Sequence, residues 1–139
     1  MATVQVEAKP EQVYRQEIKA GSFNFASDAG KEHGGMESAP NPHELLLGSL
    51  GACTSITIQM YAKRKGWDVK GVKISLSEEQ VEKADAPGGK INRINREIEL
   101  AGDLTDEQVQ SLKAIADKCP IHKLLEGQKE IATEVSHAK

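Results

Sequence analysis

Aromatic side chains are scarce in this chain: two Phe, two Tyr and one Trp make up 4% of its 139 residues. A core with so few aromatic residues must rely on aliphatic packing. Neither sign of charge dominates, because the formal net charge is −3 at pH 7 and the pI is about 5.8. The basic residues form no stripe, so the composition argues against nucleic acid as a partner.

The chain also lacks an N-terminal apolar run. Six charged side chains fall within the first twenty residues, so we predict no secretory signal peptide and expect a cytoplasmic protein. Only two cysteines are present, and in a reducing compartment these are more often free thiols or a redox pair than a structural disulfide. The length predicts a single domain over residues 1–139.

The N-terminal third combines alternation with a loop. Apolar and polar residues alternate over residues 1–27, with a break at Gly21, which predicts a meander of two or three strands. Residues 28–42 are rich in Gly, Ser, Asn and Pro and read as a loop. A long helix is predicted next, because Asn41 can cap it, Pro42 suits its first position and Glu44 suits the positive end of its dipole.

The remaining chain predicts two strands, two helices and a last strand. Alternating residues in 71–84 and 90–102 indicate a hairpin with its turn at 84–89. Residues 103–118 predict a helix with a capping box from Thr105 and Gln108. A short helix over 119–127 and a closing strand over 129–137 complete the chain. The order of elements indicates an α+β fold.

Residues 45–62 contain no charged side chain, which raises the question of a membrane span. This length is at the lower limit for crossing a bilayer, and several Gly, Ser and Thr residues dilute the hydrophobicity. We therefore predict a long buried core helix and no membrane association. A helix that is apolar on every side needs cover on every side, so we expect a homodimer in which the partner covers part of it.

The two cysteines lie 66 residues apart and stand in different settings. Cys53 sits in the uncharged helix, where a free cysteine is either core filling or a reactive thiol. Cys119 precedes Pro120 and falls near the N-cap of the short helix, where unpaired N–H groups favour a thiolate. Cys119 and His122 have the C-x-x-H spacing of metal ligands, but no second close pair completes a tetrahedral set, so no metal site is predicted.

Two segments together resemble a known family. "PNPHELLLGSLGACTSITIQMYAKRKGW" and the later "ADKCPIHKLLEG" are similar to the OsmC/Ohr family of thiol-dependent hydroperoxide reductases, and the resemblance covers nearly the whole chain. The ending "MYAKRKGW" is closer to the general OsmC-like branch. The resemblance implies an OsmC-like α+β fold formed by two intertwined subunits, with active sites at the interface.

The resemblance also implies roles for particular residues. Cys53 matches the peroxidatic cysteine of the family and Cys119 the resolving one. In the family an arginine from the N-terminal strands holds the peroxidatic sulfur as a thiolate, and Arg15 is the only arginine before the helix. The alternative for Arg15 is a solvated strand residue.

A glutamate at the helix start orients that arginine in the family. The peroxidases typically read N-P-E, whereas this chain reads N-P-H-E, so the strict match is His43, and Glu44 lies one position further on. On an ideal helix, His43 and Cys53 are about 15 Å apart along the axis, so a role requires an intervening arginine, a kink or delivery across the dimer. Glu44 as a residue that complements the helix dipole is the alternative.

The function implied is an enzyme: a cysteine-based peroxidase that reduces organic hydroperoxides in defence against oxidative stress. Its reductant would be a dithiol of the dihydrolipoyl type, with no bound cofactor. The alternative is a non-enzymatic OsmC-like dimer that binds a small apolar or thiol-containing ligand at its interface. A structural dimer with inert cysteines is a third possibility.

Overall fold

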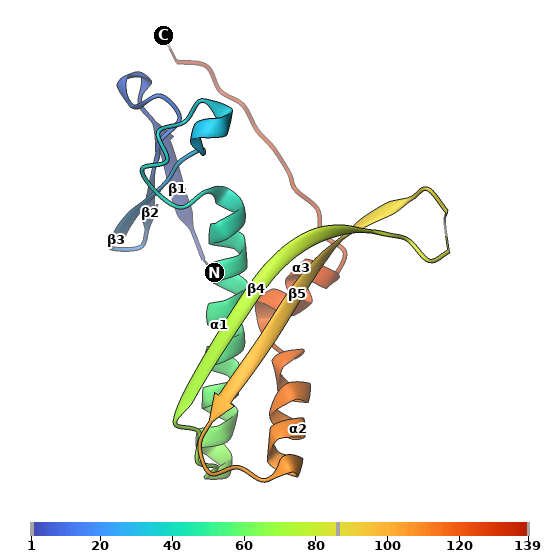
Figure 1. The fold of residues 1–139 in the computed structure, drawn as a ribbon. Coiled ribbons are helices and arrows are strands. Elements are labelled where there is room, and N and C mark those ends of the chain that lie inside the picture. Colours follow the sequence, from blue (N-terminus) through green and yellow to red (C-terminus); the bar gives the residue numbers. More distant parts are fainter. Residues whose placement is uncertain (1, 86, 139) are drawn as a thin grey trace. The chain divides into compact units, whose positions relative to one another are not determined.

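The structure, a computed structural model, describes residues 2–85 and 87–138 (Figure 1). The chain divides into two compact units, Met1–Ser49 and Leu50–Lys139, and each is described by itself. The single domain predicted over residues 1–139 stays a prediction. The elements in order are β1 (Val4–Ala8), η1 (Pro10–Gln12), β2 (Gln16–Ala20), β3 (Phe23–Ser27), η2 (Lys31–His33), α1 (Pro42–Lys65), β4 (Gly71–Glu82), β5 (Lys90–Ala101), α2 (Asp106–Ala116) and α3 (Pro120–Glu126).

The first unit contains the predicted meander. Strands β1, β2 and β3 form an antiparallel sheet in that order, and Val6 pairs with Ile18, which in turn pairs with Phe25. Gly21 makes the tight turn between β2 and β3 with φ of 62°, a conformation that side chains other than hydrogen disfavour. The sheet was predictable because its alternation of apolar and polar residues is regular.

The second unit is built on the predicted hairpin. Strands β4 and β5 pair over twelve positions, from Gly71 opposite Ala101 to Glu82 opposite Lys90. The predicted turn at 84–89 connects them, although position 86 lies outside the described residues. The half-buried side chains at one end of the hairpin share one face, as strand geometry requires. They are Val72, Ile74, Leu76, Ile94, Arg96, Ile98 and Leu100.

The core of this unit lies where α1 meets α2. Ile58 and Ala62 of α1 form a buried cluster with Leu112 and Ala116 of α2, and aliphatic residues of the hairpin pack against it. Helix α2 begins with the predicted capping box, in which Thr105 and Gln108 exchange side-chain and backbone hydrogen bonds. The α+β fold is thus confirmed, with an aliphatic core as expected from the scarcity of aromatic residues.

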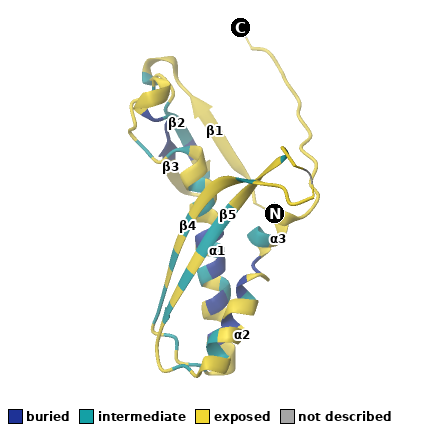
Figure 2. Cartoon of the chain, turned by 45° about the vertical axis from the view of Figure 1, so that its right-hand side comes forward, coloured by how far each residue is buried: buried dark blue, intermediate teal, exposed yellow. Residues whose placement is uncertain are grey.

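Helix α1 is buried along one stripe and not on every side. The buried positions are Leu50, Gly51, Thr54, Ile58 and Ala62, and they recur at three- and four-residue intervals (Figure 2). Ile56 and Met60 on the remaining surface are 50% and 67% exposed. The hairpin and α2 cover only one side of the helix within the single chain, and the predicted cover of the other side by a partner subunit stays a prediction. By length and composition α1 could cross a membrane, a test that core helices also pass.

The predicted closing strand over residues 129–137 does not form. Residues 128–138 have no helix or strand, and Ile131 and Val135 are 87% and 90% exposed. A strand needs a neighbouring edge to satisfy its backbone groups, and none of the described strands pairs with this segment. The alternation in the sequence could indicate a strand, but it could not supply the partner.

Gly51 permits the hairpin to approach the helix next to Cys53. A Cβ atom at this position would lie 2.8 Å from Cδ1 of Leu76 on β4. We predict that Gly51→Leu lowers the free energy of unfolding by about 1–3 kcal/mol, because it overpacks this contact. Gly51→Ala should be nearly neutral, since the end of the Leu76 side chain can move and alanine favours the helix by about 1 kcal/mol. Chemical denaturation checks both variants, and equal stabilities would contradict the close approach.

Candidate active site

The second unit brings the two cysteines together. Cys53 lies in the middle of α1 and Cys119 directly before α3, and each thiol is among the groups that shift the pKa of the other. Both cysteines are free thiols. Cys53 is partly exposed, whereas Cys119 is completely buried. The accessible thiol is thus the one on the long helix, and the enclosed thiol is its neighbour.

Cys119 occupies the predicted N-cap position of α3. Its backbone is extended, with φ of −59° and ψ of 132°, and Pro120 follows at the first helical position. The Sγ atom accepts a hydrogen bond of 3.3 Å from the backbone N–H of His122. Proline begins the helix without needing a partner for its nitrogen, so the N–H groups that follow can serve the sulfur.

The two thiols have opposite acidities. Burial raises the pKa of Cys53, and the hydrogen bond and charge of Cys119 raise it further, against smaller lowering effects from the Ile121 N–H and the Thr57 hydroxyl. Burial alone would also raise the pKa of Cys119. Hydrogen bonds from Cys53, from the N–H groups of His122 and Ile121 and from the Thr54 hydroxyl outweigh burial, so the net shift is downward. The pair therefore holds its first negative charge on Cys119.

This ordering predicts a two-step titration of the reduced protein. One thiolate per chain should form below the ordinary thiol pKa of 9.0, and the second only above it, because the first charge opposes the second. Ultraviolet thiolate absorbance from neutral to alkaline pH measures both steps. In Cys119→Ser the low step should disappear. A single step of two thiolates near pH 9.0 would contradict the ordering.

A polar network that the sequence did not reveal lies beside the thiols. Arg96 of β5 donates from Nη1 to the hydroxyl of the buried Thr54 at 3.0 Å and from Nη2 to Oδ1 of Asp117 at 2.9 Å. The Thr54 hydroxyl itself donates to the carbonyl of Leu50 at 2.7 Å. Asp117 also lies 3.9 Å from Nδ1 of His122. The signal was a charged residue at position 96 in the apolar row of Ile94, Ile98 and Leu100, but only the fold identifies its partners.

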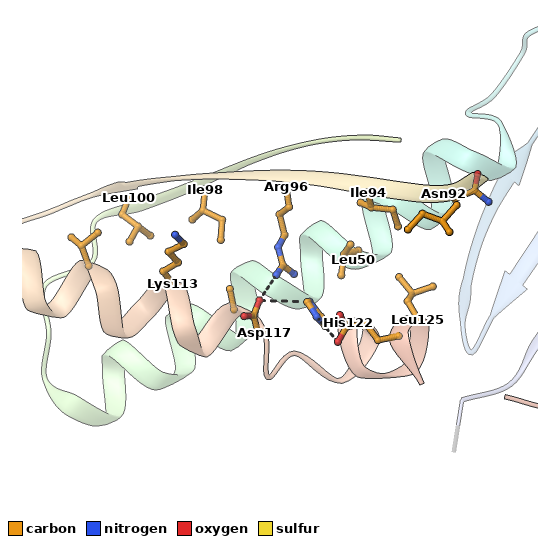
Figure 3. A pocket seen from close by; sticks show the side chains of 14 residues that line it. Leu50, Asn92, Ile94, Arg96, Ile98, Leu100, Lys113, Asp117, His122 and Leu125 are labelled. Carbon is orange, nitrogen blue, oxygen red and sulfur yellow. Dashed lines mark hydrogen bonds and ion pairs between the residues drawn. The ribbon is translucent and has the colours of Figure 1, made fainter. Parts of the chain in front are cut away.

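A cavity of about 840 Å³ lies next to this network, between β5 and the helices α2 and α3. Figure 3 shows Arg96 reaching from β5 to Asp117, and His122 on the facing helix. Neither cysteine lines the cavity. The remaining wall is mostly aliphatic and includes Leu50, Ile91, Ile94, Ile98, Leu100, Val109 and Leu125. This volume and lining are typical of small-ligand pockets.

Arg15 belongs to the first unit and has partners there. Its Nε donates to Oε1 of Glu17 at 2.9 Å, and its Nη1 donates to the hydroxyl of Ser38 at 3.0 Å. Ser38 also binds the carboxylate of Asp28 through its hydroxyl and its backbone N–H, and these hydrogen bonds lower the pKa of Asp28. Arg15 is therefore held by side chains of its own unit. Its predicted role at the cysteine remains a prediction.

Glu44 has a structural partner at the start of α1. Its Oε1 accepts a hydrogen bond of 3.0 Å from the backbone N–H of Asn41, and its own N–H donates to Oδ1 of Asn41 at 2.8 Å. This reciprocal pair is a capping box, so the alternative of a helix-stabilising role for Glu44 has direct support. His43 lies exposed in the first turn. A catalytic role for either residue remains a prediction.

No metal-binding cluster is present among residues 2–85 and 87–138: nowhere do three or more His, Cys, Asp or Glu residues converge. The nearest approach is His122 with Asp117 and Glu126, at 3.9 Å and 3.0 Å. These distances describe ion pairs, and Glu126 is largely exposed.

Comparison with known proteins identifies a family and solved structures with a similar fold. A sequence model of the OsmC-like protein family matches residues 34–134. Among solved structures, the OsmC-like protein of Mycoplasma pneumoniae has a TM-score of 0.74 and 18% identity, with 91% of this chain and 88% of that chain covered. The organic hydroperoxide resistance protein OhrB of Bacillus subtilis has a TM-score of 0.61 and 20% identity, with 91% of both chains covered.

An organic hydroperoxide resistance protein OsmC from Legionella pneumophila has a TM-score of 0.66 and 16% identity, with 91% and 90% of the two chains covered. At these identities the likeness to solved structures concerns the fold. No curated protein matches the chain.

Proposed function

Because this chain belongs to the OsmC-like protein family, we propose that it is a thiol-dependent peroxidase that reduces organic hydroperoxides through Cys53 and Cys119. The observation that carries the proposal is a pair of free thiols near enough to shift each other's pKa, one accessible and one buried, contributed by segments 66 residues apart. An intramolecular disulfide needs two sulfurs within reach of each other, and redox reactivity needs at least one thiolate. The pair supports both requirements.

The first step is attack of the Cys53 thiolate on the hydroperoxide. Cys53 reaches its thiolate form when its proton passes to the neighbouring sulfur of Cys119. The new S–O bond forms as the O–O bond breaks, and the departing alkoxide takes a proton from water and leaves as the alcohol. Cys53 is oxidised to the sulfenic acid and the hydroperoxide is reduced.

The second step is condensation of the two cysteines. The sulfur of Cys119 attacks the sulfur of the Cys53 sulfenic acid, the S–S bond forms and the S–O bond breaks. The hydroxide that departs takes the proton of Cys119 and leaves as water. A dithiol reductant of the dihydrolipoyl type then reduces the disulfide by two thiol exchanges and is itself oxidised to its cyclic disulfide.

Turnover of a hydroperoxide tests this proposal. Cumene hydroperoxide with dihydrolipoamide should be consumed catalytically, with one disulfide of lipoamide formed for each hydroperoxide reduced. The same mixture with Cys53→Ser protein is the control. Absence of turnover above that control, with properly folded and fully reduced protein, would exclude the peroxidase.

A homodimer is part of this proposal. Apolar side chains on the uncovered surface of α1, among them Ile56 and Met60, are exposed in the single chain, and a second copy would bury them. In the first unit, Val4, Val6 and Phe23 are also exposed. We place this dimer in the cytoplasm, away from membranes. A monomeric mass in sedimentation at micromolar concentration would contradict it.

Arg15 would stabilise the Cys53 thiolate, with Glu44 or His43 orienting it. In the described part of the second unit, no guanidinium is among the groups that shift the pKa of Cys53. A cation that stabilises its thiolate would therefore come from elsewhere. We predict that Arg15→Gln lowers kcat/KM for cumene hydroperoxide by about 10²-fold, the size of effect of losing one preorganised donor. Arg93→Gln is the matched control, because it removes the same positive charge from an exposed arginine of β5. Equal kcat/KM in Arg15→Gln and the parent protein would exclude this role.

A non-enzymatic binding function is the second candidate. The raised pKa of Cys53, caused mainly by burial, favours an unreactive thiol, and the aliphatic cavity of about 840 Å³ is of a suitable size for a small apolar or thiol-containing ligand. In that case 1-hexanethiol should raise the Tm of the protein, because it binds only the folded state. Both protein thiols would remain free after exposure to cumene hydroperoxide.

A further inference from the structure

Asp28 is a buried carboxylate of the first unit, and its hydrogen-bond donors come from the loop that follows β3. Its residue is only 2% exposed, and a charged group at such a site is costly unless hydrogen bonds satisfy it. Oδ1 accepts a hydrogen bond of 2.7 Å from the Ala29 N–H. Oδ2 accepts from both the backbone N–H, at 3.0 Å, and the hydroxyl of Ser38. The buried carboxylate therefore fixes Ser38 by two bonds.

The backbone of this loop also keeps Ser38 in place. The Asp28 N–H donates to the Pro40 carbonyl at 3.1 Å, and the Glu37 N–H donates to the Ala29 carbonyl at 3.1 Å. Glu37 has a φ of 54°, which is uncommon for a residue with a side chain. Such conformations persist where the surrounding contacts determine them, and they cluster at functional sites. The loop therefore presents Ser38 in one defined orientation.

The Ser38 hydroxyl connects the buried carboxylate to Arg15. Its single hydrogen is donated to Asp28, so its oxygen remains an acceptor. The Nη1 atom of Arg15 donates to that oxygen at 3.0 Å and to the Ser38 carbonyl at 3.2 Å. A guanidinium can only donate and an ionised carboxylate can only accept, so the hydroxyl must accept from one and donate to the other. Serine and threonine meet this requirement, and alanine does not.

Two of the three guanidinium nitrogens of Arg15 are held in this way. Nε donates to Oε1 of Glu17 at 2.9 Å, and Nη1 is held by Ser38. Within the part of the chain that the structure describes, Nη2 makes no hydrogen bond, and the Arg15 side chain is 30% exposed. Because the guanidinium is planar and rigid, fixing two nitrogens also fixes the direction of the third. Nη2 therefore keeps its N–H groups for another acceptor.

We propose that Ser38 is a positioning residue for Arg15 and is itself held in place by Asp28. Together with Glu17, Ser38 fixes two guanidinium nitrogens, so that Nη2 presents its N–H groups to the Cys53 thiolate. The inference rests on the proposed peroxidase function, in which Arg15 stabilises that thiolate, and it adds Ser38 and Asp28 to the residues that orient the arginine. Ser38 touches neither the sulfur nor the hydroperoxide in this account.

The first experiment observes the Arg15 guanidinium without any catalysis. Hydrogen bonds slow its rotation about the Cζ–Nε bond, and ¹H–¹⁵N exchange spectra measure the rate of that rotation. The signals of Arg15 are those that disappear in Arg15→Gln protein. Ser38→Ala should increase the rotation rate about tenfold, the effect of losing one hydrogen bond to a charged group. Ser38→Thr should keep the parent rate, and an equal rate in Ser38→Ala would overturn the proposal.

The second experiment measures whether this orientation matters for hydroperoxide reduction. Ser38→Ala should lower kcat/KM for cumene hydroperoxide by about tenfold, because it misplaces a group that acts on the nucleophile. Ser38→Thr should keep the parent value, since threonine can make the same two bonds. In the Arg15→Gln background, Ser38→Ala should cause no further loss, because the residue that it positions is absent. A further loss there, or an unchanged kcat/KM in Ser38→Ala alone, would overturn the proposal.

Two further variants make the result specific. Ser111→Ala removes a hydroxyl from an exposed serine of α2 and should change neither the rotation rate nor kcat/KM. Asp28→Asn should lower kcat/KM in the same direction as Ser38→Ala, and a parent value in folded Asp28→Asn protein would overturn the part assigned to Asp28. If Asp28→Asn does not fold, Ser38→Ala still decides, because Ser38 is exposed. If the parent protein reduces no hydroperoxide, the peroxidase function fails, and the rotation rates still decide whether Ser38 holds Arg15.

Discussion

Replacing Cys53 by serine is expected to abolish hydroperoxide reduction. Cys53 is the accessible thiol of the pair, and without its sulfur neither the S–O bond of the sulfenic acid nor the later disulfide can form. We predict that Cys53→Ser lowers kcat for cumene hydroperoxide by at least about 10³-fold, as expected for loss of a nucleophile. Consumption of hydroperoxide with dihydrolipoamide as reductant measures the loss.

Folding must be shown to be intact for this comparison. Serine is slightly smaller than cysteine and Cys53 is only partly buried, so the Tm and the oligomeric state should match those of the parent. Cys53→Ala provides a second variant without a hydroxyl. Full activity in either variant would exclude Cys53 as the nucleophile and, with it, the proposed mechanism.

Replacing Cys119 by serine should stop the reaction after its first step. The Cys53 sulfenic acid then has no neighbouring sulfur to condense with, so dimedone should trap it, and the protein mass should increase by one dimedone adduct. We predict that turnover falls by at least about tenfold, because a dithiol from solution replaces a thiol that already lies beside Cys53.

The parent protein is the control for trapping, since it should form the disulfide and little adduct. Cys119 is completely buried and its sulfur caps α3 by accepting a hydrogen bond from the His122 N–H, which a serine hydroxyl can also accept. A lack of adduct in folded Cys119→Ser protein would show that Cys53 forms no sulfenic acid. An unchanged turnover rate would show that Cys119 does not resolve it.

Local patterns were sufficient to predict most of the fold. The meander follows from period-two alternation, and the start of α2 from the spacing of Thr105 and Gln108, which exchange the expected hydrogen bonds. Cys119 was predictable as a cap because Pro120 comes next, and proline fits the first position of a helix. Each of these features depends on residues a few positions apart.

Features that depend on distant partners were not predictable in this way. The predicted closing strand does not form, because alternation in the sequence does not supply an edge to pair with. Arg96 was overlooked for the same reason. Its partners Thr54 and Asp117 are 42 and 21 residues away in the sequence. They meet Arg96 only when β5 packs against α1 and against the segment between α2 and α3.

The two thiols differ in acidity: the pKa of Cys53 is raised mainly by burial, and that of Cys119 is lowered by its hydrogen bonds. In the proposed mechanism, transfer of the Cys53 proton to the Cys119 thiolate converts the accessible thiol into the nucleophile.

The most direct test of the account is the fate of the two thiols after one equivalent of cumene hydroperoxide is added to reduced protein. Free thiols should fall by two per chain, and peptide mapping should find Cys53 joined to Cys119 within one chain. No covalent crosslink between chains should form, and dihydrolipoamide should restore both thiols. Retention of both thiols, or disulfides only between chains, would contradict a peroxidatic and resolving pair.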